Sequence, residues 1–395
     1  MRKLKLGIIG VGNIGSTHFK NVIGGKCPEI EITAVADRRE ARRAWVNETF
    51  ASSAKAESYT AAAPVIFNEG DELIASGLVD AILIAVPHYD HPYFAIEAFK
   101  HGLHVMCEKP AGVYTLQVRE MIAEADKHPE LYFGMMFNQR TNPVYRKMHD
   151  IIASGELGQI RRTSWLITEW YRSQYYYDSG DWRATWSGEG GGVLLNQCPH
   201  QLDLWQWICG LPVKVHAKMK YGKWHNIEVE DDVSCWCEYA NGATGTFITS
   251  TGDCPGTNRF EIVCDGGTLV CDKTSLKLYR LNPWEPEYSK TTKKVFGRPE
   301  VIEEIPELEG ENTQHVGVLN AFADAILNGG KLVADGREGI NGLMLSNAMH
   351  LSDWLNKEVD LPIDEELYYN LLKEKIASSK AKTADAVDGD TEGSY

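Results

Sequence analysis

The sequence lacks three features that mark other classes of protein: a long hydrophobic run, a framework of cysteines and an excess of positive charge. No run reaches the roughly 18 apolar residues that a transmembrane helix needs. The basic start lacks the apolar core and small-residue cleavage site of a signal peptide. The nine cysteines among 395 residues include no CxxC pair, which is typical of reduced thiols used as small hydrophobic side chains. We therefore expect a cytoplasmic protein without a membrane partner.

The charge balance and the lack of metal-binding motifs exclude two further classes. The chain has 40 Lys and Arg against 55 Asp and Glu, a net charge of −15. We expect no nucleic-acid partner, because a protein that binds phosphates needs a basic surface. No HExxH or CxxC pattern accompanies the histidines of 88–91 or those at 101 and 104, so we expect no metal. At about 100–200 residues per domain, the length predicts two domains.

The hydrophobic pattern changes once along the chain. Up to Phe137, short apolar runs alternate with amphipathic segments, as in a parallel, doubly wound sheet with helices between its strands. Beyond it, strand-like runs follow one another through turns such as Asn241-Gly242, which is typical of an antiparallel sheet. We therefore predict an α/β protein with a parallel-sheet domain over 1–137, an α+β domain with an open, mostly antiparallel sheet over 138–380, and a flexible acidic tail over 381–395.

The individual runs predict the following elements. Strands are expected in the first part at Leu4–Ile9, Ile30–Ala36, Ala81–Val86, His104–Cys107 and Tyr132–Met136. Strands are expected in the second part at Arg161–Glu169, Val213–Lys220, Val233–Tyr239, Ala243–Thr249, Phe260–Cys264 and Thr268–Cys271. Late helices are expected at His315–Leu327, Gly339–Asn356 and Glu365–Ile376.

A glycine-rich motif follows the first expected strand and begins a helix. Residues 10–15 read GVGNIG and match GxGxxG, and Asp37 ends the second strand. In this context the glycines let the backbone approach a pyrophosphate at the helix N-terminus, and Asp37 binds the adenosine ribose hydroxyls. A carboxylate there repels a 2′-phosphate, so the sequence favours NAD, while the neighbouring Arg38 and Arg39 leave NADP open. We expect a Rossmann domain with cofactor contacts from Gly10, Gly12, Asn13, Ile14, Gly15, Asp37 and Arg38.

Several motifs together resemble one family. Lys109 follows the fourth expected strand, and ligands of doubly wound sheets bind beyond the carboxyl ends of strands. With GxGxxG, the motifs AVPHYDH at 85–91, EKP at 108–110, FNQR at 137–140, GGGVLLNQCPHQLD at 190–203 and LNAFADAILNGG at 319–330 resemble the glucose–fructose oxidoreductase/inositol dehydrogenase (Gfo/Idh/MocA) family. The resemblance implies a nicotinamide cofactor, a sugar or cyclitol substrate, and a dimer or tetramer formed through the open sheet.

The resemblance also implies roles for single residues. By position, Lys109 resembles the catalytic lysine of the family and His200 its catalytic histidine, and further cofactor contacts are implied for Pro87, His88, His91, Glu108, Lys109, Asn138 and Arg140. The family commonly has Asp where this chain has Asn196. Residues four apart on a helix share a face, so we expect Asn196 and His200 both to point toward the substrate. Because Asn supplies no charge, the proton acceptor stays open, with Asp203 as an alternative carboxylate.

The expected reaction explains the choice of these residue types. Oxidation of a secondary alcohol removes a hydride from carbon and a proton from oxygen, and a general base must take the proton. Histidine suits this task, with an unperturbed pKa of about 6.5. We expect His200 to accept the proton while Lys109 holds and polarises the same oxygen, although the two roles could be exchanged.

Aromatic residues are concentrated in the segment 165–186, WLITEWYRSQYYYDSGDWRATW. About half of them are expected in the core or in an oligomer interface. The others suit a sugar platform, because aromatic rings pack on the apolar faces of sugars while polar groups bind the hydroxyls. The expected substrate contacts are Lys109, Tyr171, Arg172, Tyr176, Asp178, Trp182, Arg183, Asn196 and His200.

Three functions follow from these patterns. The leading interpretation is an NAD(P)-dependent dehydrogenase of a sugar or glycoside, closest within the family to enzymes that act on the ring C3 hydroxyl of glucosides. The first alternative is an NAD-dependent glycosidase that acts by transient oxidation and elimination. The second is a sugar sensor without catalysis, which the asparagine at position 196 favours and the intact EKP motif and His200 disfavour.

Overall fold

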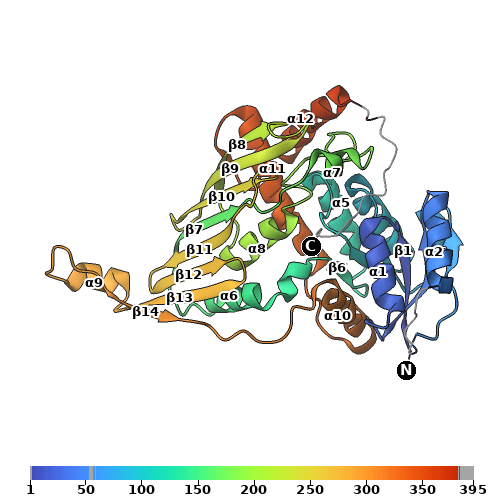
Figure 1. The fold of residues 1–395 in the computed structure, drawn as a ribbon, viewed down its shortest axis with the longest axis horizontal. Coiled ribbons are helices and arrows are strands. Elements are labelled where there is room, and N and C mark those ends of the chain that lie inside the picture. The colour runs from blue at the N-terminus through green and yellow to red at the C-terminus, as the bar shows by residue number, and fades with distance from the viewer. Residues whose placement is uncertain (1, 53–56, 58, 381, 383–395) are drawn as a thin grey trace. The chain divides into compact units, whose positions relative to one another are not determined.

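The chain forms two compact units, which are described separately below. The computed structural model describes residues 2–52, 57, 59–380 and 382. The first unit comprises Met1–Thr141 and Thr313–Leu343, and the second comprises Asn142–Asn312 and the described residues from Met344 onward. Figure 1 shows the elements of both units along the chain.

The first unit is built on a six-stranded parallel sheet, as the sequence predicts. Its strand order is β3-β2-β1-β4-β5-β6, and every neighbouring pair is parallel. The order reverses between β1 and β4, and in such sheets ligands bind beyond the carboxyl ends of the strands at this reversal. The strands are β1 (Leu4–Ile9), β2 (Ile30–Ala36), β3 (Val65–Phe67), β4 (Ala81–Ile84), β5 (His104–Cys107) and β6 (Phe133–Met135).

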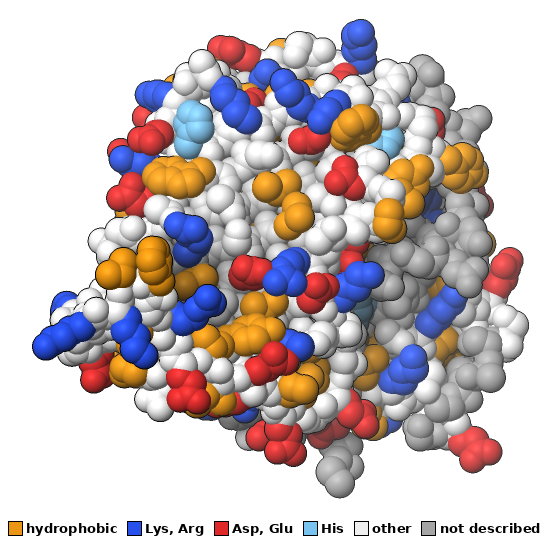
Figure 2. Space-filling view, turned by 60° about the vertical axis from the view of Figure 1, so that its left-hand side comes forward, with side chains coloured by type: hydrophobic (Ala, Val, Ile, Leu, Met, Phe, Trp, Pro, Cys, Tyr) orange, Lys and Arg blue, Asp and Glu red, His pale blue; other side chains and the backbone are white. Residues whose placement is uncertain are grey.

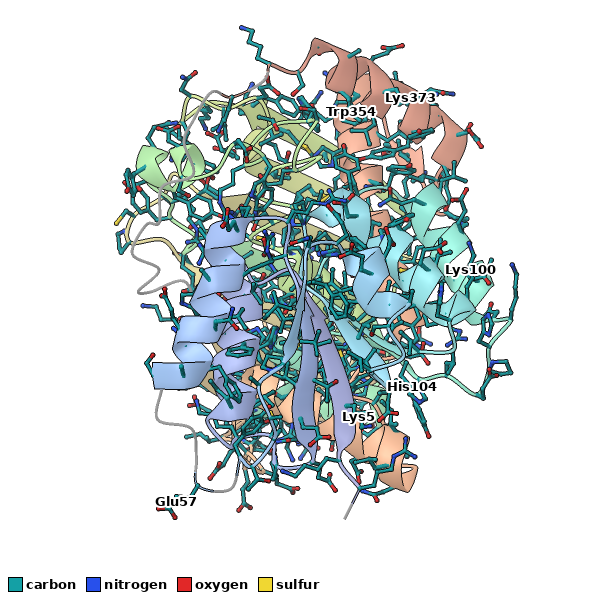
Figure 3. All side chains as sticks on the ribbon, turned by 90° about the vertical axis from the view of Figure 1, so that its right-hand side faces the viewer. Lys5, Glu57, Lys100, His104, Trp354 and Lys373 are labelled. Carbon is teal, nitrogen blue, oxygen red and sulfur yellow. The ribbon has the colours of Figure 1, made fainter. Side chains whose placement is uncertain are left out.

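Helices pack on both faces of this sheet. One hydrophobic cluster joins β1, β2 and β4 to α1 (Asn13–Ile23), α2 (Glu40–Ser52) and α10 (Gln314–Asn328). On the other face, Leu73 of α3 (Gly70–Ile74) lies against Gly7 of β1, and α4 (His91–Lys100) packs beside α5 (Thr115–Ala125) and β5. Figure 3 looks onto this unit, with Lys5 and His104 labelled near the amino-terminal ends of β1 and β5.

The placement of α10 differs from the expected division into 1–137 and 138–380. This helix lies in the first unit because its apolar side chains, among them Val318, Leu319 and Phe322, are fully buried in the cluster around β1. The segment Asn142–Asn312 is thus inserted between β6 and α10, and the rest of the second unit follows α10 from Met344 onward. Of the expected tail over 381–395, only Lys382 lies within the described residues.

The second unit is built on a nine-stranded sheet, and the predicted mostly antiparallel pairing is confirmed. Its order is β14-β13-β12-β11-β7-β10-β9-β8-β15, with β10 and β7 as a parallel pair among antiparallel ones. Its strands are β7 (Ile160–Ile167), β8 (Lys214–Tyr221), β9 (Glu230–Glu238), β10 (Thr244–Ser250), β11 (Asn258–Cys264), β12 (Gly267–Asp272), β13 (Ser275–Asn282), β14 (Glu300–Glu304) and β15 (Val359–Asp360).

Helices pack on one face of this sheet. Trp205 stacks on Phe247 of β10, with ring centroids 5.3 Å apart, and Ser352 accepts a hydrogen bond from the backbone of Ala217 in β8. The opposite face presents Leu166 and Ile248, each more than a third exposed. In Figure 2, hydrophobic side chains are scattered between charges of both signs. The helices of this unit are α6 (Pro143–Ala153), α7 (Gln174–Asp178), α8 (Pro199–Cys209), α9 (Glu285–Thr291), α11 (Gly339–Leu355) and α12 (Glu365–Ser378). Of these, α9 is at least partly exposed at every residue, and α11 begins in the first unit.

Within the described part of the chain, every helix is too short or too polar to cross a bilayer.

Candidate active site

The turn between β1 and α1 has the geometry of a dinucleotide-binding loop. Gly10 has φ +88°, and a Cβ on it would lie 2.5 Å from the carbonyl oxygen of Ala85. A Cβ on Gly15 would overlap the carbonyl oxygen of Gly10. At Gly12, the nearest atom to such a Cβ is a guanidinium nitrogen of Arg39, 3.7 Å away. The outer glycines are therefore required by packing, while the middle one leaves room for a pyrophosphate above the first turn of α1.

Asp37 lies at the carboxyl end of β2, directly beside this turn. Its Oδ2 accepts a hydrogen bond from the backbone of Val11 at 2.9 Å, and its Oδ1 accepts one from the backbone of Arg39 at 2.9 Å. Arg38, the expected cofactor contact, instead pairs with Glu69 at 2.8 Å. The arginine that lies nearest to the glycine-rich turn is Arg39.

Glu108 and Lys109 follow β5 and form part of a buried polar cluster. Glu108 is almost fully buried, and its Oε1 lies 2.7 Å from Nε2 of His18 on α1. The backbone of Lys109 donates to its Oε2 at 3.2 Å. Burial by itself raises the pKa of Glu108, but the hydrogen bond and charge of His18 and the charge of Lys109 outweigh it, so the pKa falls to about 2. This arrangement places a fixed negative charge beside Lys109.

Two further members of this cluster, His18 and His315, were not predicted. The ring of His315 on α10 meets that of His18 edge to face, with centroids 5.4 Å apart. Burial, with smaller contributions from His18 and Lys109, lowers the pKa of His315 to about 4. The sequence offers a signal for His18, which lies on the helix that the glycine-rich motif begins. It offers none for His315.

His91 ties together the loops that follow β4 and β5. Its Nδ1 lies 2.7 Å from the carbonyl oxygen of Pro110, and its Nε2 lies 2.8 Å from that of Val86. The side chain is buried, and burial lowers its pKa. Pro87 and His88 belong to the same loop, in which η1 (His88–Asp90) precedes α4. His91 therefore orients the two loops at the carboxyl edge of the sheet.

Asn138 and Arg140 lie in η2 (Asn138–Thr141), directly after β6, and both are buried. The Asn138 amide donates to the side chain of Gln314 at 2.5 Å, and Arg140 pairs with Glu338 at 2.7 Å. Both contacts join η2 to the late segment of the first unit. They account for Nδ2 of Asn138 and for the Arg140 guanidinium, whereas Oδ1 of Asn138 is buried without a hydrogen-bond partner among the described residues.

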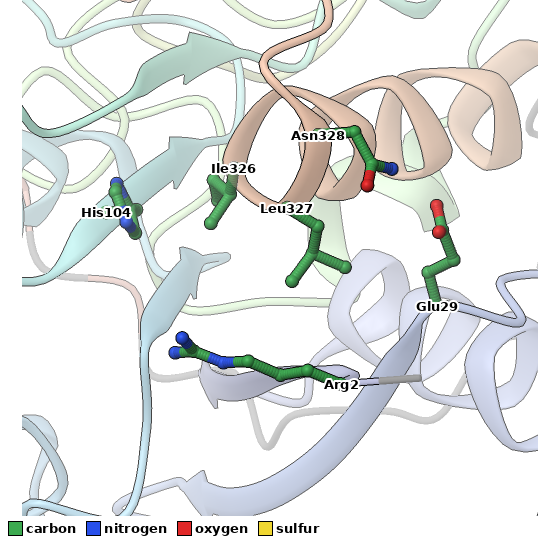
Figure 4. A pocket seen from close by; sticks show the side chains of 6 residues that line it. All are labelled: Arg2, Glu29, His104, Ile326, Leu327 and Asn328. Carbon is green, nitrogen blue, oxygen red and sulfur yellow. The ribbon is translucent and has the colours of Figure 1, made fainter.

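A cavity of about 370 Å³ lies at the other end of the parallel sheet. Arg2, His104 and Leu327 line it, and Figure 4 shows them with the remaining lining residues. It lies near the amino-terminal ends of β1 and β5, whereas ligands of such sheets bind at the carboxyl ends. None of the predicted site residues lines this cavity.

In the second unit, His200 lies in the first turn of α8 and is buried. The expectation that Asn196 shares this helix is wrong, because α8 begins at Pro199 and Asn196 lies in the preceding turn. Proline has no N–H and a fixed φ, which favours the first position of a helix. Asp203 accepts a hydrogen bond from Gln206 on the same helix.

A buried carboxylate holds the loop that leads to α8. Glu230 of β9 accepts hydrogen bonds from the backbones of Gly192, at 2.8 Å, and Leu194, at 3.0 Å. Its Oε2 also lies 3.0 Å from Nε2 of His350, and Nδ1 of that ring lies 2.9 Å from the carbonyl oxygen of Ser346. Glu230 and His350 were not predicted, because nothing near them in the sequence indicates this pairing. They fix the glycine-rich loop in which Asn196 lies.

Four of the predicted substrate residues gather in one cluster of the second unit. The Tyr176 hydroxyl accepts hydrogen bonds from Arg183, at 2.8 Å, and from Gln197, at 3.1 Å. The Arg183 guanidinium lies 4.5 Å from the Tyr176 ring centroid and 4.7 Å from that of Trp182. Arg172 lies over Tyr176 at 5.2 Å. Because Gln197 follows Asn196 directly, this aromatic cluster adjoins the loop before His200.

The other aromatic residues of 165–186 divide as expected between surface and core. Trp165 stacks on Phe260 in the core, with centroids 4.2 Å apart, and Tyr177 is buried and donates to Thr251. Tyr171 is half exposed. The Asp178 carboxylate accepts a hydrogen bond from the Gln174 amide within α7, and this contact stabilises the short helix.

The described residues contain no group of three or more His, Cys, Asp or Glu arranged to hold a metal ion.

The family follows from two matches that together cover most of the chain. Residues 4–135 match the "Oxidoreductase family, NAD-binding Rossmann fold", and residues 145–270 match the "GFO/IDH/MocA C-terminal domain". The chain belongs to the Gfo/Idh/MocA family of oxidoreductases, and its first unit carries an NAD-binding Rossmann domain.

The similar proteins include dehydrogenases of several different compounds. The chain is 27% identical over 53% of its length to the rhizopine catabolism protein MocA of Rhizobium meliloti, and over 56% to an inositol 2-dehydrogenase of Corynebacterium glutamicum. These matches span 58% of each relative. Among solved structures, the WlbA dehydrogenase of Bordetella pertussis, in complex with NADH and UDP-GlcNAcA, is 23% identical with a TM-score of 0.74, over 92% of this chain and all of that one. A levoglucosan dehydrogenase in complex with NADH and L-sorbose is 19% identical with a TM-score of 0.72, with the same coverage of both chains.

Proposed function

We propose that this protein is an NAD-dependent dehydrogenase that oxidises a secondary hydroxyl of a sugar or glycoside. The observation that carries this proposal is the hydrogen bond between Gln197 and Tyr176, because it joins an aromatic, arginine-rich cluster to the loop before His200. Inositol and levoglucosan dehydrogenases among the relatives support the substrate class. Within this class, the C3 hydroxyl of a glucoside is the first position to test.

The cluster has the chemistry that a sugar ring needs. Aromatic rings pack on apolar C–H faces, and guanidinium groups donate hydrogen bonds to hydroxyl oxygens. Arg183 is held between the rings of Tyr176 and Trp182, so its donors are oriented before a ligand arrives. Preorganisation of this kind reduces the entropy lost on binding.

Lys109 and His200 divide the proton chemistry. NAD, when bound, supplies the carbon that accepts the hydride. His200 accepts the proton of the reacting hydroxyl, and Lys109 donates a hydrogen bond to the same oxygen and stabilises the negative charge that develops on it. The carboxylate of Glu108 accepts a hydrogen bond from the backbone of Lys109 and so supports the position of this residue after β5.

The test is turnover of a panel of sugars, glycosides and polyols with NAD, followed by absorbance of NADH and by product analysis for keto-sugars. We expect Lys109→Ala and His200→Ala each to lower kcat by about 10²- to 10⁴-fold, the usual contribution of an acid–base residue. Binding of NADH should be retained in His200→Ala. Near wild-type turnover in either variant contradicts its assigned role.

Matched controls use side chains of the same type on the surface. Lys100→Ala removes an exposed lysine paired with Glu97, and His128→Ala removes a partly exposed histidine. Both should keep wild-type turnover. Free aglycone without net NADH or keto-sugar identifies a glycosidase that returns the hydride, and sugar binding without any turnover identifies a sensor.

A further inference from the structure

Glu189 joins the two parts of the candidate substrate site in the second unit. Only 2% of this residue is exposed. Its Oε2 accepts a hydrogen bond from the backbone of Ala184 at 2.6 Å, and its Oε1 accepts one from Nδ2 of Asn196. A single buried carboxylate therefore contacts both the aromatic segment and the loop that leads to His200.

On the aromatic side, Glu189 supports an unusual backbone conformation. Ala184 has φ +54°, a left-handed conformation that is uncommon for residues other than glycine and persists where surrounding contacts hold it. The hydrogen bond from its N–H to Glu189 is such a contact. Because Ala184 directly follows Arg183, this conformation helps to set the direction in which the guanidinium leaves the chain toward Tyr176.

On the other side, Glu189 determines how the Asn196 amide is oriented. A carboxylate only accepts hydrogen bonds, whereas an amide has a donor nitrogen on one side and an acceptor oxygen on the other. The carboxylate must therefore face Nδ2, which turns Oδ1 of Asn196 away from it. An oxygen held in this way accepts a hydrogen bond from a hydroxyl group.

We propose that Glu189 is a positioning residue that sets Asn196 as a hydrogen-bond acceptor for a hydroxyl group of the substrate. This selects substrates with several hydroxyls, because a second hydroxyl must donate to Asn196 while the first one reacts. The inference rests on the proposed function and adds a residue that determines its specificity.

The charge of Glu189 makes this role dependent on pH. Burial raises the pKa of Glu189, while the charge of Arg183 and the hydrogen bonds from Ala184 and Asn196 lower it, and Glu230 raises it further. Tyr177 and Lys382 also interact with the carboxylate. As the pH falls through the raised pKa, the carboxyl gains a proton and can donate as well as accept. The orientation of Asn196 is then lost, and kcat/KM for the sugar should fall on the acid side.

The experiment removes the carboxylate at position 189 and then places one at position 196. Glu189→Gln keeps the shape but removes the charge, and Glu189→Gln with Asn196→Asp places the carboxylate at the other position. We expect Glu189→Gln to raise KM for the sugar about 10- to 100-fold, the effect of losing one charge-assisted hydrogen bond, and to abolish the acid limb of the pH profile. KM for NAD should stay unchanged. The double variant should reverse at least half of the increase in log KM for the sugar that Glu189→Gln causes.

The control is Glu228→Gln, which makes the same chemical change at a carboxylate that contacts the backbones of Trp186 and Lys380 but not Asn196. The inference is overturned if Glu189→Gln matches this control in KM and pH profile, or if the double variant is no better than Glu189→Gln. If the wild-type protein oxidises no compound of the panel, the proposed function fails. The Glu189 contact is then judged by Tm alone, which should fall in Glu189→Gln and recover in the double variant.

Discussion

Nε2 of His18 lies 2.7 Å from Oε1 of Glu108, so a histidine on α1 and a carboxylate after β5 form a fully buried pair. Removing one partner of a buried pair leaves the other uncompensated, at a cost of about 3–5 kcal/mol. We expect Glu108→Gln to lower the free energy of unfolding of the first unit by this amount, as measured by urea unfolding at pH 7. Glu124→Gln breaks the surface pair with Lys127 and should change the free energy of unfolding little. If Glu108→Gln and Glu124→Gln lowered this free energy equally, the role of burial would be contradicted.

The stability of the first unit should also depend on His315. Its pKa falls from an ordinary 6.5 to about 4, so between these values the unfolded chain binds a proton that the folded one does not. Its stabilising contribution is therefore present above pH 6.5 and lost as the pH falls toward 4, with a loss of about 2 kcal/mol at pH 5. Thermal unfolding between pH 7.5 and 4.5 measures this loss. His315→Gln should flatten the profile over this window, while His128→Gln should not. Identical profiles for wild type and His315→Gln would refute the assignment.

Asp37 should set both the affinity for NADH and the preference against NADPH. Its carboxylate holds the glycine-rich turn through Val11 and is placed to bind the ribose hydroxyls and repel a 2′-phosphate. We expect Asp37→Ala to weaken NADH binding about tenfold or more. The difference in affinity between NADH and NADPH should also become smaller. Fluorescence titration with each cofactor measures both effects. Glu29→Gln, just before the start of β2, is the control and should change neither value.

The outward face of the nine-stranded sheet should form a contact between copies of the chain. Ile248 of β10 and Leu166 of β7 are register partners on this face and are both partly exposed. A charge in an apolar interface core is costly when it is unpaired. We expect the chain to be a dimer or tetramer by light scattering and Ile248→Asp to reduce its mass. Phe296→Asp, at an almost fully exposed side chain beyond α9, should not. If Phe296→Asp reduced the mass and Ile248→Asp did not, the interface would lie at the segment beyond α9.

Much of the first unit could be predicted because its signals are local. The expected strands Leu4–Ile9, Ile30–Ala36 and His104–Cys107 coincide with β1, β2 and β5, since buried parallel strands read as continuous apolar runs. The turn that requires Gly10 and Gly15 is likewise encoded within a few residues. β3 was missed because its apolar run is only three residues long, and the mostly exposed β14 was missed because acidic residues flank its two apolar ones.

The sequence by itself determined the fold class, the family and the identity of Lys109 and His200 as candidates, because each depends on residues close together in the chain. Only the tertiary structure decided which charges accompany them. His18 and Glu108 are 90 positions apart, and Glu230 is 38 positions from the Gly192 backbone that it holds. A buried polar group must find partners wherever the fold brings them. For Asn196, which lies in a turn, the fold supplies the carboxylate of Glu189 from the turn before it.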